Sequence, residues 1–361
     1  MTRRYPEEHF FVGEYRPVFE SNTRTYQESM QPNYPLISQD EPAAILDALI
    51  LLNVFRQDES ITSVAKAGEG NMNLVLRVTT DRQSVIVKQA RPWVEKYRDI
   101  PAPAERILSE IEFYRRISND QSVSDAMPSV LASDVSRRLM VLEDLGQSSD
   151  YATLYGSQKA ATEVDAVFRL AVGWVARLHG CDAAGQNKIG CSPLLELNHQ
   201  YIFSVPLQDP PVADLDSVCE GLADASRALC ADESVRRAME RLGKIYLESD
   251  GPLLHGDFHP GSWLNTEKGF QVIDPEFCFC GAREFELGVI AAHWIFCGSE
   301  ASSATIDRVC DLYSKEVSRE LLLGFTGAEL VRRLIGVAQP PLDADLNRRV
   351  EWLQCGEKFL K

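Results

Sequence analysis

The first half of the sequence lacks cysteine, and no Cys-x-x-Cys pair occurs anywhere. All nine cysteines lie between Cys181 and Cys355, at irregular spacing. A disulfide framework or a structural zinc site needs regular pairs or histidine partners at ligand spacing. We therefore expect reduced, mostly buried thiols, because a free cysteine behaves as a small hydrophobic residue.

Long apolar runs are also absent. The two longest, Ala43 to Phe55 and Leu287 to Cys297, are interrupted by Asp47 and His293, and both are shorter than the ~20 residues that cross a bilayer. Residues 1–20 are polar and aromatic, unlike a charged and then apolar signal segment. We expect a cytoplasmic protein without a membrane segment.

Positive charge is scarce, with 37 Lys and Arg residues against 53 Asp and Glu residues and a net charge of −16. This charge repels a phosphate backbone, so nucleic-acid binding is not expected. It is compatible with cations such as Mg²⁺ or an amine substrate. The 361 residues, 45% of them hydrophobic, are enough for about two globular domains.

Residues 1–44 are predicted to form an N-terminal arm. Its aromatic residues, from Phe10 to Tyr34, follow no helical or strand period. Such side chains would dock on the folded body or on a neighbouring subunit, which leaves a homodimer open. A solvated tail is the alternative.

Residues 45–147 are predicted to form a first domain built on a sheet. A helix over 41–55 precedes it, and the apolar pattern then changes to short alternating runs. The expected elements are strands at 61–67, 74–79 and 84–89, a helix at 104–117, and strands at 129–134 and 139–145.

Residues 148–361 are predicted to form a mostly helical second domain, so the fold class is α+β. The expected helices cover 164–178, 215–229, 233–247, 284–296, 305–322, 328–337 and 346–359. A strand-like pair, 253–258 and 270–277, interrupts them.

This strand-like pair carries the densest cluster of polar residues. Asp257 follows an apolar run where a strand opens into a loop, and Asp274 and Glu276 lie two apart on one face of the second run. Phosphoryl transfer needs one carboxylate to orient the attacking hydroxyl and others to hold Mg²⁺. Taken singly, the same residues are compatible with a turn and a strand end. Their combination favours catalysis.

The cluster resembles the aminoglycoside phosphotransferase and choline kinase superfamily of protein-kinase-like enzymes. The motif His255-Gly256-Asp257-x-His259, followed by Ile273 to Phe277, carries the resemblance. More narrowly, the chain is similar to the S-methyl-5-thioribose kinases, whose further motifs match Gly68 to Asn73, Val87 to Ala90, Met140 to Leu145, Asp274 to Gly281 and Arg332 to Gly336. The resemblance implies a bilobal protein-kinase-like fold, with an antiparallel five-stranded sheet in the N-terminal lobe.

The resemblance also implies roles in the use of ATP and Mg²⁺. Asp257 would be the catalytic base, and Asp274 with Glu276 would bind the metal. Lys88 would contact the α- and β-phosphates and be held by Glu110, which a Glu-x-x-x-Tyr pattern favours over Glu112. A buried charged lysine needs such a carboxylate partner.

Further positions would contact the nucleotide. A turn would arch over the phosphates with Gly68, Gly70, Asn71 and Asn73. The hinge from Glu143 to Leu145 would offer backbone groups to adenine. Ser262 stands where most relatives have a metal-binding Asn.

Arg332 and Arg333 would contact sugar hydroxyls or the transferred phosphate. Consecutive helical residues point about 100° apart, so we expect at most one of the two to be fully buried. An ion-paired or solvated helix face is the alternative. His255 and His179 are expected to be structural.

Two positions depart from the family pattern: Ile100 replaces a lid tryptophan, and Glu286 replaces an aspartate. The first hypothesis is a kinase of a small molecule with a free hydroxyl, a pentose-like sugar with 5-methylthioribose as the leading candidate. The second changes the acceptor to an aminoglycoside, a choline-like compound or another amino alcohol. The third is a nucleotide-binding regulator without catalysis.

Overall fold

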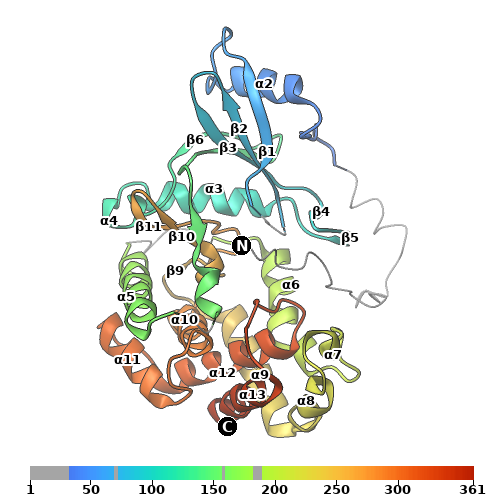
Figure 1. Cartoon of the computed structure of the whole chain (residues 1–361), viewed down its shortest axis with the longest axis vertical. Coiled ribbons are helices and arrows are strands. Elements are labelled where there is room, and N and C mark those ends of the chain that lie inside the picture. Colours follow the sequence, from blue (N-terminus) through green and yellow to red (C-terminus); the bar gives the residue numbers. More distant parts are fainter. Residues whose placement is uncertain (1–31, 69–71, 157–158, 182–188) are drawn as a thin grey trace, which may run out of the picture.

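The computed structural model describes residues 32–68, 72–156, 159–181 and 189–361. Gly70 and Asn71 lie outside the described residues, as do the aromatic residues of the arm before residue 32. Figure 1 shows a sheet-rich part at one end of the molecule and a helical part at the other. This two-part α+β architecture agrees with the predicted fold class.

The N-terminal sheet has five antiparallel strands in the order β1-β2-β3-β7-β6. Their bounds are β1 Ile61–Lys66, β2 Leu74–Thr80, β3 Ser84–Gln89, β6 Val130–Asp134 and β7 Leu139–Glu143. All five were predicted, because short runs rich in β-branched residues between turn residues are typical of strands.

Each face of this sheet is covered by one helix. α2 (Pro42–Leu51) places Ile45 and Leu49 against Leu76 and Val78. On the other face, α3 (Arg106–Ile117) lies between the sheet and the helical part (Figure 1). β3 is the central strand of the sheet. Its C-terminal end is directed toward the helical part.

Most of the short strands were not predicted. β4 (Trp93–Val94) pairs with β5 (Tyr97–Pro101), and β10 (Trp263–Thr266) pairs with both β8 (Ser149–Asp150) and β11 (Gly269–Val272). The remaining pair is β9 (Leu253–Leu254) with β12 (Phe279–Cys280). The strand-like pair expected at 253–258 and 270–277 is thus found only in part, as β9 and β11, and these two strands do not pair with each other. Runs of two to five residues carry too little periodicity to be recognised from the sequence.

The helical part surrounds two large apolar clusters. Its longer helices are α5 Ala161–Leu178, α6 Ser192–Phe203, α8 Leu222–Ala231, α9 Glu233–Glu248, α10 Arg283–Phe296, α11 Ser303–Tyr313, α12 Arg319–Ile335 and α13 Leu346–Leu360. Its short helices are α4 Gln121–Ser124, η1 Tyr151–Tyr155, η2 Val205–Leu207, α7 Leu215–Val218 and η3 Pro260–Ser262. Every residue from Phe285 to Phe296 of α10 is buried, so this helix is the centre of the part.

Three helix predictions need correction. The helix expected over 215–229 is divided: α7 ends at Val218, where Cys219 is extended, and α8 begins after Gly221, which has a φ of 85°. The helix expected over 305–322 ends at Tyr313, because Ser314 has a left-handed φ of 57°, and α12 then covers the gap expected at 323–327. α6 was not predicted.

The chain before α2 is fixed to the sheet. The Tyr34 hydroxyl donates to the Ala90 carbonyl at 2.8 Å, and the Gln89 side chain bonds both Pro35 O and the Ile37 N–H at 3.0 and 2.9 Å. This part of the arm therefore docks on the folded body. The main sheet ends at Glu143 and β8 begins at Ser149, so the domain boundary near 147 stays a proposal.

Two absences concern the described residues. None of the helices in these ranges is long and apolar enough to cross a membrane. The nine cysteines are all free, but only Cys230, Cys278 and Cys355 are buried and the other six are partly exposed, so the expectation of mostly buried thiols is wrong.

Candidate active site

A cavity of about 880 Å³ lies between the sheet and the helical part. It is bounded by the first three strands and the hinge on one side and by the 255–262 loop, α6 and the end of α12 on the other. Most of the predicted site residues line it. They are Gly68, Lys88, Glu110, Glu143, Leu145, Asp257, Ser262, Asp274, Glu276, Arg332 and Arg333.

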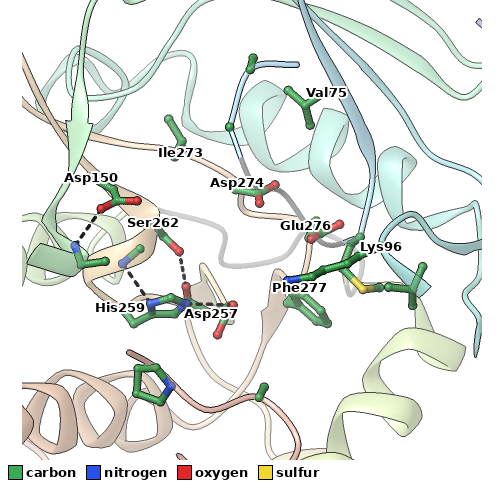
Figure 2. A pocket seen from close by; sticks show the side chains of 18 of the residues that line it. Val75, Lys96, Asp150, Asp257, His259, Ser262, Ile273, Asp274, Glu276 and Phe277 are labelled. Atoms are coloured by element: carbon green, nitrogen blue, oxygen red, sulfur yellow. Dashed lines mark hydrogen bonds and ion pairs between the residues drawn. The ribbon is translucent and has the colours of Figure 1, made fainter. Parts of the chain in front are cut away.

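Asp257 lies at the wall of this cavity, in the loop after β9 (Figure 2). Its Oδ1 is 2.9 Å from Arg333 Nη2 and 3.6 Å from Arg332 Nη2, and its Oδ2 is 3.4 Å from His259 Nε2. Burial raises the pKa of Asp257, but His259 and the two arginines outweigh burial and hold the pKa well below its usual value. Asp257 is therefore a carboxylate at neutral pH.

The loop that carries Asp257 is fixed from two sides. Glu286 Oε1 accepts the N–H groups of His255 and Gly256 at 2.7 and 3.0 Å. Gly256 has a φ of 89°, and a Cβ there would lie 2.0 Å from the Phe277 carbonyl oxygen. Only glycine allows the loop to pack this closely against the 273–277 segment that carries Asp274 and Glu276. This segment is not the strand expected over 270–277, because β11 ends at Val272 and Asp274 has a left-handed φ of 68°.

Three further contacts concern residues singled out in the sequence, two of them in this loop. The Ser262 hydroxyl donates to the Asp257 carbonyl at 2.8 Å, which ties η3 to the loop. His255 is completely buried, with Nε2 2.9 Å from Ile273 O. His179 bonds Glu286 Oε2 at 2.7 Å. The structural roles predicted for both histidines are confirmed by these contacts.

Lys88 lies on the central strand β3, with Nζ 2.7 Å from a carboxylate oxygen of Glu110 and in direct contact with Asp274. Burial lowers the pKa of Lys88, but the attraction of Asp274, Glu110 and Glu276 outweighs it and raises the pKa. Burial raises the pKa of Glu110 to about 7, although Lys88 opposes this shift. A charged lysine thus lies among three acidic side chains at the inner end of the cavity.

Glu276 is held by two side chains from the N-terminal part. It accepts a 2.6 Å hydrogen bond from Asn73 Nδ2, and Arg106 Nε lies 3.6 Å away. Burial and the charge of Asp274 raise the pKa of Glu276 to about 8. Asn73 is buried and does not line the cavity, so its side chain supports Glu276 and does not face the cavity.

Arg106 was missed in the sequence, because no motif marks it. Its side chain is completely buried, and it donates to Met72 O at 2.7 Å, Arg91 O at 2.8 Å and Asn73 Oδ1 at 2.9 Å. It thereby joins the end of the 68–73 turn to the segment that leads into β4. The β4–β5 hairpin contributes Ile100 to the cavity wall.

The donor set for a magnesium ion consists of two carboxylates. Asp274 and Glu276 lie on the same side of the cavity (Figure 2), and no group of three or more His, Cys, Asp or Glu residues in the described ranges is arranged as a metal site. Mg²⁺ is commonly held by one or two carboxylates together with water and phosphate oxygens. The two residues fit that chemistry.

The hinge residues line the cavity beyond the end of β7. The Glu143 side chain is engaged by Lys268 and by the Ser129 N–H. The N–H of Leu145 takes part in no turn or loop hydrogen bond of the described chain. The backbone of this segment, and not the Glu143 carboxylate, is therefore what a nucleotide base could bind.

Arg332 and Arg333 are both buried, at 7% and 6% exposure, and both line the cavity, so neither of them lies on a solvated helix face. Both guanidinium groups bend toward Glu329, three and four residues earlier on α12, and both reach Asp257. Side chains at i, i+3 and i, i+4 share one helix face, and long side chains can converge there despite a 100° offset. The Glu-x-x-Arg-Arg spacing was the signal that could have identified Glu329.

Glu329 is also bonded to His293 of α10, whose Nδ1 lies 2.6 Å from the Tyr155 hydroxyl. Burial and the neighbouring charges of Arg333 and His259 lower the pKa of His293 to about 3, although Glu329 opposes the shift. His293 is therefore neutral in the folded protein at neutral pH.

Stability is expected to fall in mild acid because of His293. Below pH 6.5 an unfolded histidine binds a proton, while folded His293 stays neutral to about pH 3, so the free energy of unfolding decreases by up to ~1.4 kcal/mol per pH unit. Urea unfolding between pH 7 and pH 5 should show a flatter pH dependence for His293→Gln than for the wild type. Equal slopes would contradict this assignment.

Comparisons with known proteins agree with this geometry. The model of a family described as "Phosphotransferase enzyme family" matches residues 63–320. A methylthioribose kinase of Bacillus pumilus is 24% identical, covering 92% of this chain and 94% of its own. One of Exiguobacterium sibiricum is 26% identical over 81% and 83%. The crystal structure of choline kinase LicA from Streptococcus pneumoniae covers 90% of this chain and 99% of its own, with a TM-score of 0.53 at 15% identity.

Proposed function

This chain belongs to the phosphotransferase enzyme family and is a small-molecule kinase, and on that basis we propose that it transfers the γ-phosphoryl group of ATP to a hydroxyl of a pentose-like sugar. The leading candidate for the acceptor is 5-methylthioribose. One observation carries the choice of a sugar: two buried arginines, Arg332 and Arg333, converge on Asp257 at the cavity wall.

Asp257 would orient the attacking hydroxyl. The hydroxyl oxygen bonds to the γ-phosphorus, its proton passes to the carboxylate, and ADP leaves with the electrons of the broken bond. Arg333 already occupies Oδ1, so the hydroxyl would approach Oδ2. In phosphoryl transfer, positioning and charge stabilisation account for most of the catalysis, and an ionised, immobilised carboxylate suits that demand.

Lys88 would contact the α- and β-phosphates, and the backbone at Leu145 would contact adenine. Glu110 keeps Lys88 charged and oriented, at 2.7 Å. Asp274 and Glu276 would hold Mg²⁺, which neutralises phosphate charge when bound. Asn73 and Arg106 would keep Glu276 in place.

The acceptor end of the cavity suits a neutral molecule with one apolar arm. The charges of the two guanidinium groups are balanced by Asp257 and Glu329. Val212, Val218 and Pro340 contribute an apolar wall, which fits a methylthio group. A cationic amino alcohol would lie close to two guanidinium groups and gain nothing from them.

The test is phosphate transfer from Mg²⁺–ATP to a panel of 5-methylthioribose, ribose, choline and an aminoglycoside, beside calorimetric binding of ATP. We expect the highest kcat/KM with 5-methylthioribose. Preferential transfer to choline or the aminoglycoside would replace the sugar by an amino alcohol. Mg²⁺-dependent ATP binding without transfer to any acceptor would indicate a regulator.

A further inference from the structure

A closed ring of side chains joins α12 to the loop that carries Asp257. Arg333 bridges Asp257 and Glu329, at 2.9 and 2.8 Å. Glu329 accepts from His293 Nε2 at 3.1 Å. The ring of His293 stacks on that of His259, with centroids 5.2 Å apart, and His259 Nε2 lies 3.4 Å from Asp257.

Glu329 is the most heavily bonded member of this ring. It is only 1% exposed, and its two oxygens accept hydrogen bonds from Arg332 Nε and Nη2, Arg333 Nε and His293 Nε2. Burial raises the pKa of Glu329, but the two arginines and His293 hold it well below the usual value. Charge-assisted hydrogen bonds of this kind fix the geometry of a guanidinium plane.

The far side of Glu329 is fixed as well. Because the Glu329 carboxylate is ionised, His293 must carry its hydrogen on Nε2, and Nδ1 then accepts from the Tyr155 hydroxyl at 2.6 Å. Glu329 therefore has three bonded neighbours on two helices, all of them side chains of the protein.

The charge balance explains what Glu329 does for Asp257. With Glu329 in place, two guanidinium groups face two carboxylates. Without it, Asp257 is the only carboxylate among the described partners of Arg332 and Arg333, and both guanidinium groups would turn to it. Both of its oxygens would then be engaged, and a hydroxyl would have to displace a cation.

We propose that Glu329 is a positioning residue that holds Arg332 and Arg333 away from Oδ2 of Asp257, so that this oxygen, which His259 approaches at 3.4 Å, stays free of arginine and accessible to the acceptor hydroxyl. The proposal rests on the proposed function for its kinetic consequence only. The arrangement of the two arginines is a property of the protein itself and is measured separately.

The experiment uses Glu329→Gln, which keeps the shape of the side chain and removes its charge. A misplacement of about 1 Å at a reacting group can cost ~10²-fold in rate. We expect kcat/KM for the acceptor to fall ~10- to 100-fold, with the Kd of Mg²⁺–ATP changed less than about twofold because Lys88 and the hinge lie elsewhere. Phenylglyoxal labelling followed by mass spectrometry should modify Arg332 and Arg333 faster than in the wild type, because their guanidinium groups would move from Glu329, whose side chain is 1% exposed, to Asp257 at the cavity wall, whose side chain is 30% exposed.

Glu320→Gln is the matched control, because Glu320 lies on the same helix with a side chain that is 75% exposed. This variant should leave kcat/KM for the acceptor, the Kd of Mg²⁺–ATP and the labelling of Arg332 and Arg333 unchanged. Arginines that stay protected in folded Glu329→Gln, or equal losses toward acceptor and ATP, would overturn the proposal. If the wild type phosphorylates no acceptor, the proposed function fails and the labelling alone decides the role of Glu329. If Glu329→Gln does not fold, the same labelling is applied to His293→Gln, which removes one hydrogen bond to Glu329. Faster modification of Arg332 and Arg333 would again support the proposal, and unchanged protection would overturn it.

Discussion

Asp257→Asn is expected to lower kcat for phosphate transfer by ~10²- to 10⁴-fold, the range typical for loss of a positioned general base. The amide keeps an oxygen that can accept from Arg333, now 2.9 Å from Oδ1, but it cannot take the proton of the acceptor hydroxyl. Steady-state kinetics with saturating ATP and the best acceptor of the panel would measure the loss. The Kd of Mg²⁺–ATP should change little.

A matched control is Asp224→Asn on α8, since the side chain of Asp224 is 79% exposed and lies outside the cavity. It should retain wild-type kcat. Thermal unfolding of both variants would separate a loss of chemistry from a loss of folded protein. Near-full turnover by folded Asp257→Asn would mean that another group orients the hydroxyl.

The sequence was sufficient to predict most of the five-stranded sheet and the convergence of Lys88, Asp257 and Asp274 on one cavity. Three charged residues of the cavity follow or lie in an apolar run: Lys88 in β3, Asp257 after β9, and Asp274 after β11. Apolar runs form buried strands. A polar residue at the end of such a run therefore lies where the strand leaves the apolar core. All three line the same cavity.

Other features depend on contacts that no local pattern encodes. Arg106 lies in an ordinary helix start, yet its charge is buried against backbone oxygens of a distant turn and hairpin. The end of α11 at Tyr313 depends on one residue, Ser314, with a left-handed φ. Apolar spacing alone continues across that point, so the periodicity placed the helix boundary nine residues too late.

The burial of Arg332 and Arg333 likewise depends on contacts that no local sequence pattern encodes. Helical geometry alone separates consecutive side chains, and only the positions of Glu329 and Asp257 in space show why both guanidinium groups turn inward. Helical spacing predicts the face of the helix from which a side chain leaves the backbone. For a long side chain such as arginine, the position of its charged partner determines where the guanidinium group lies.

Lys88→Met is expected to remove both activity and several kcal/mol of stability. Breaking a buried ion pair by removing one partner typically costs ~3–5 kcal/mol, and here Glu110 and Glu276, both 5% exposed or less, would lose the cation they share. Loss of a cation that stabilises phosphoryl charge typically lowers kcat by ~10²- to 10³-fold. Urea unfolding and single-turnover transfer from ATP would measure the two effects.

The stability deficit of Lys88→Met should depend on pH in a direction fixed by Glu110. Its pKa is already raised to about 7 by burial, and without Lys88 it rises further. A raised carboxyl pKa gives stability at low pH that is lost as the pH rises, so the deficit relative to the wild type should widen between pH 6 and pH 8.5. Adding Glu110→Gln should recover stability but no activity, and Lys244→Met, at a side chain 72% exposed, should change neither. A double variant that recovered turnover would show that Lys88 serves only to balance charge in the fold.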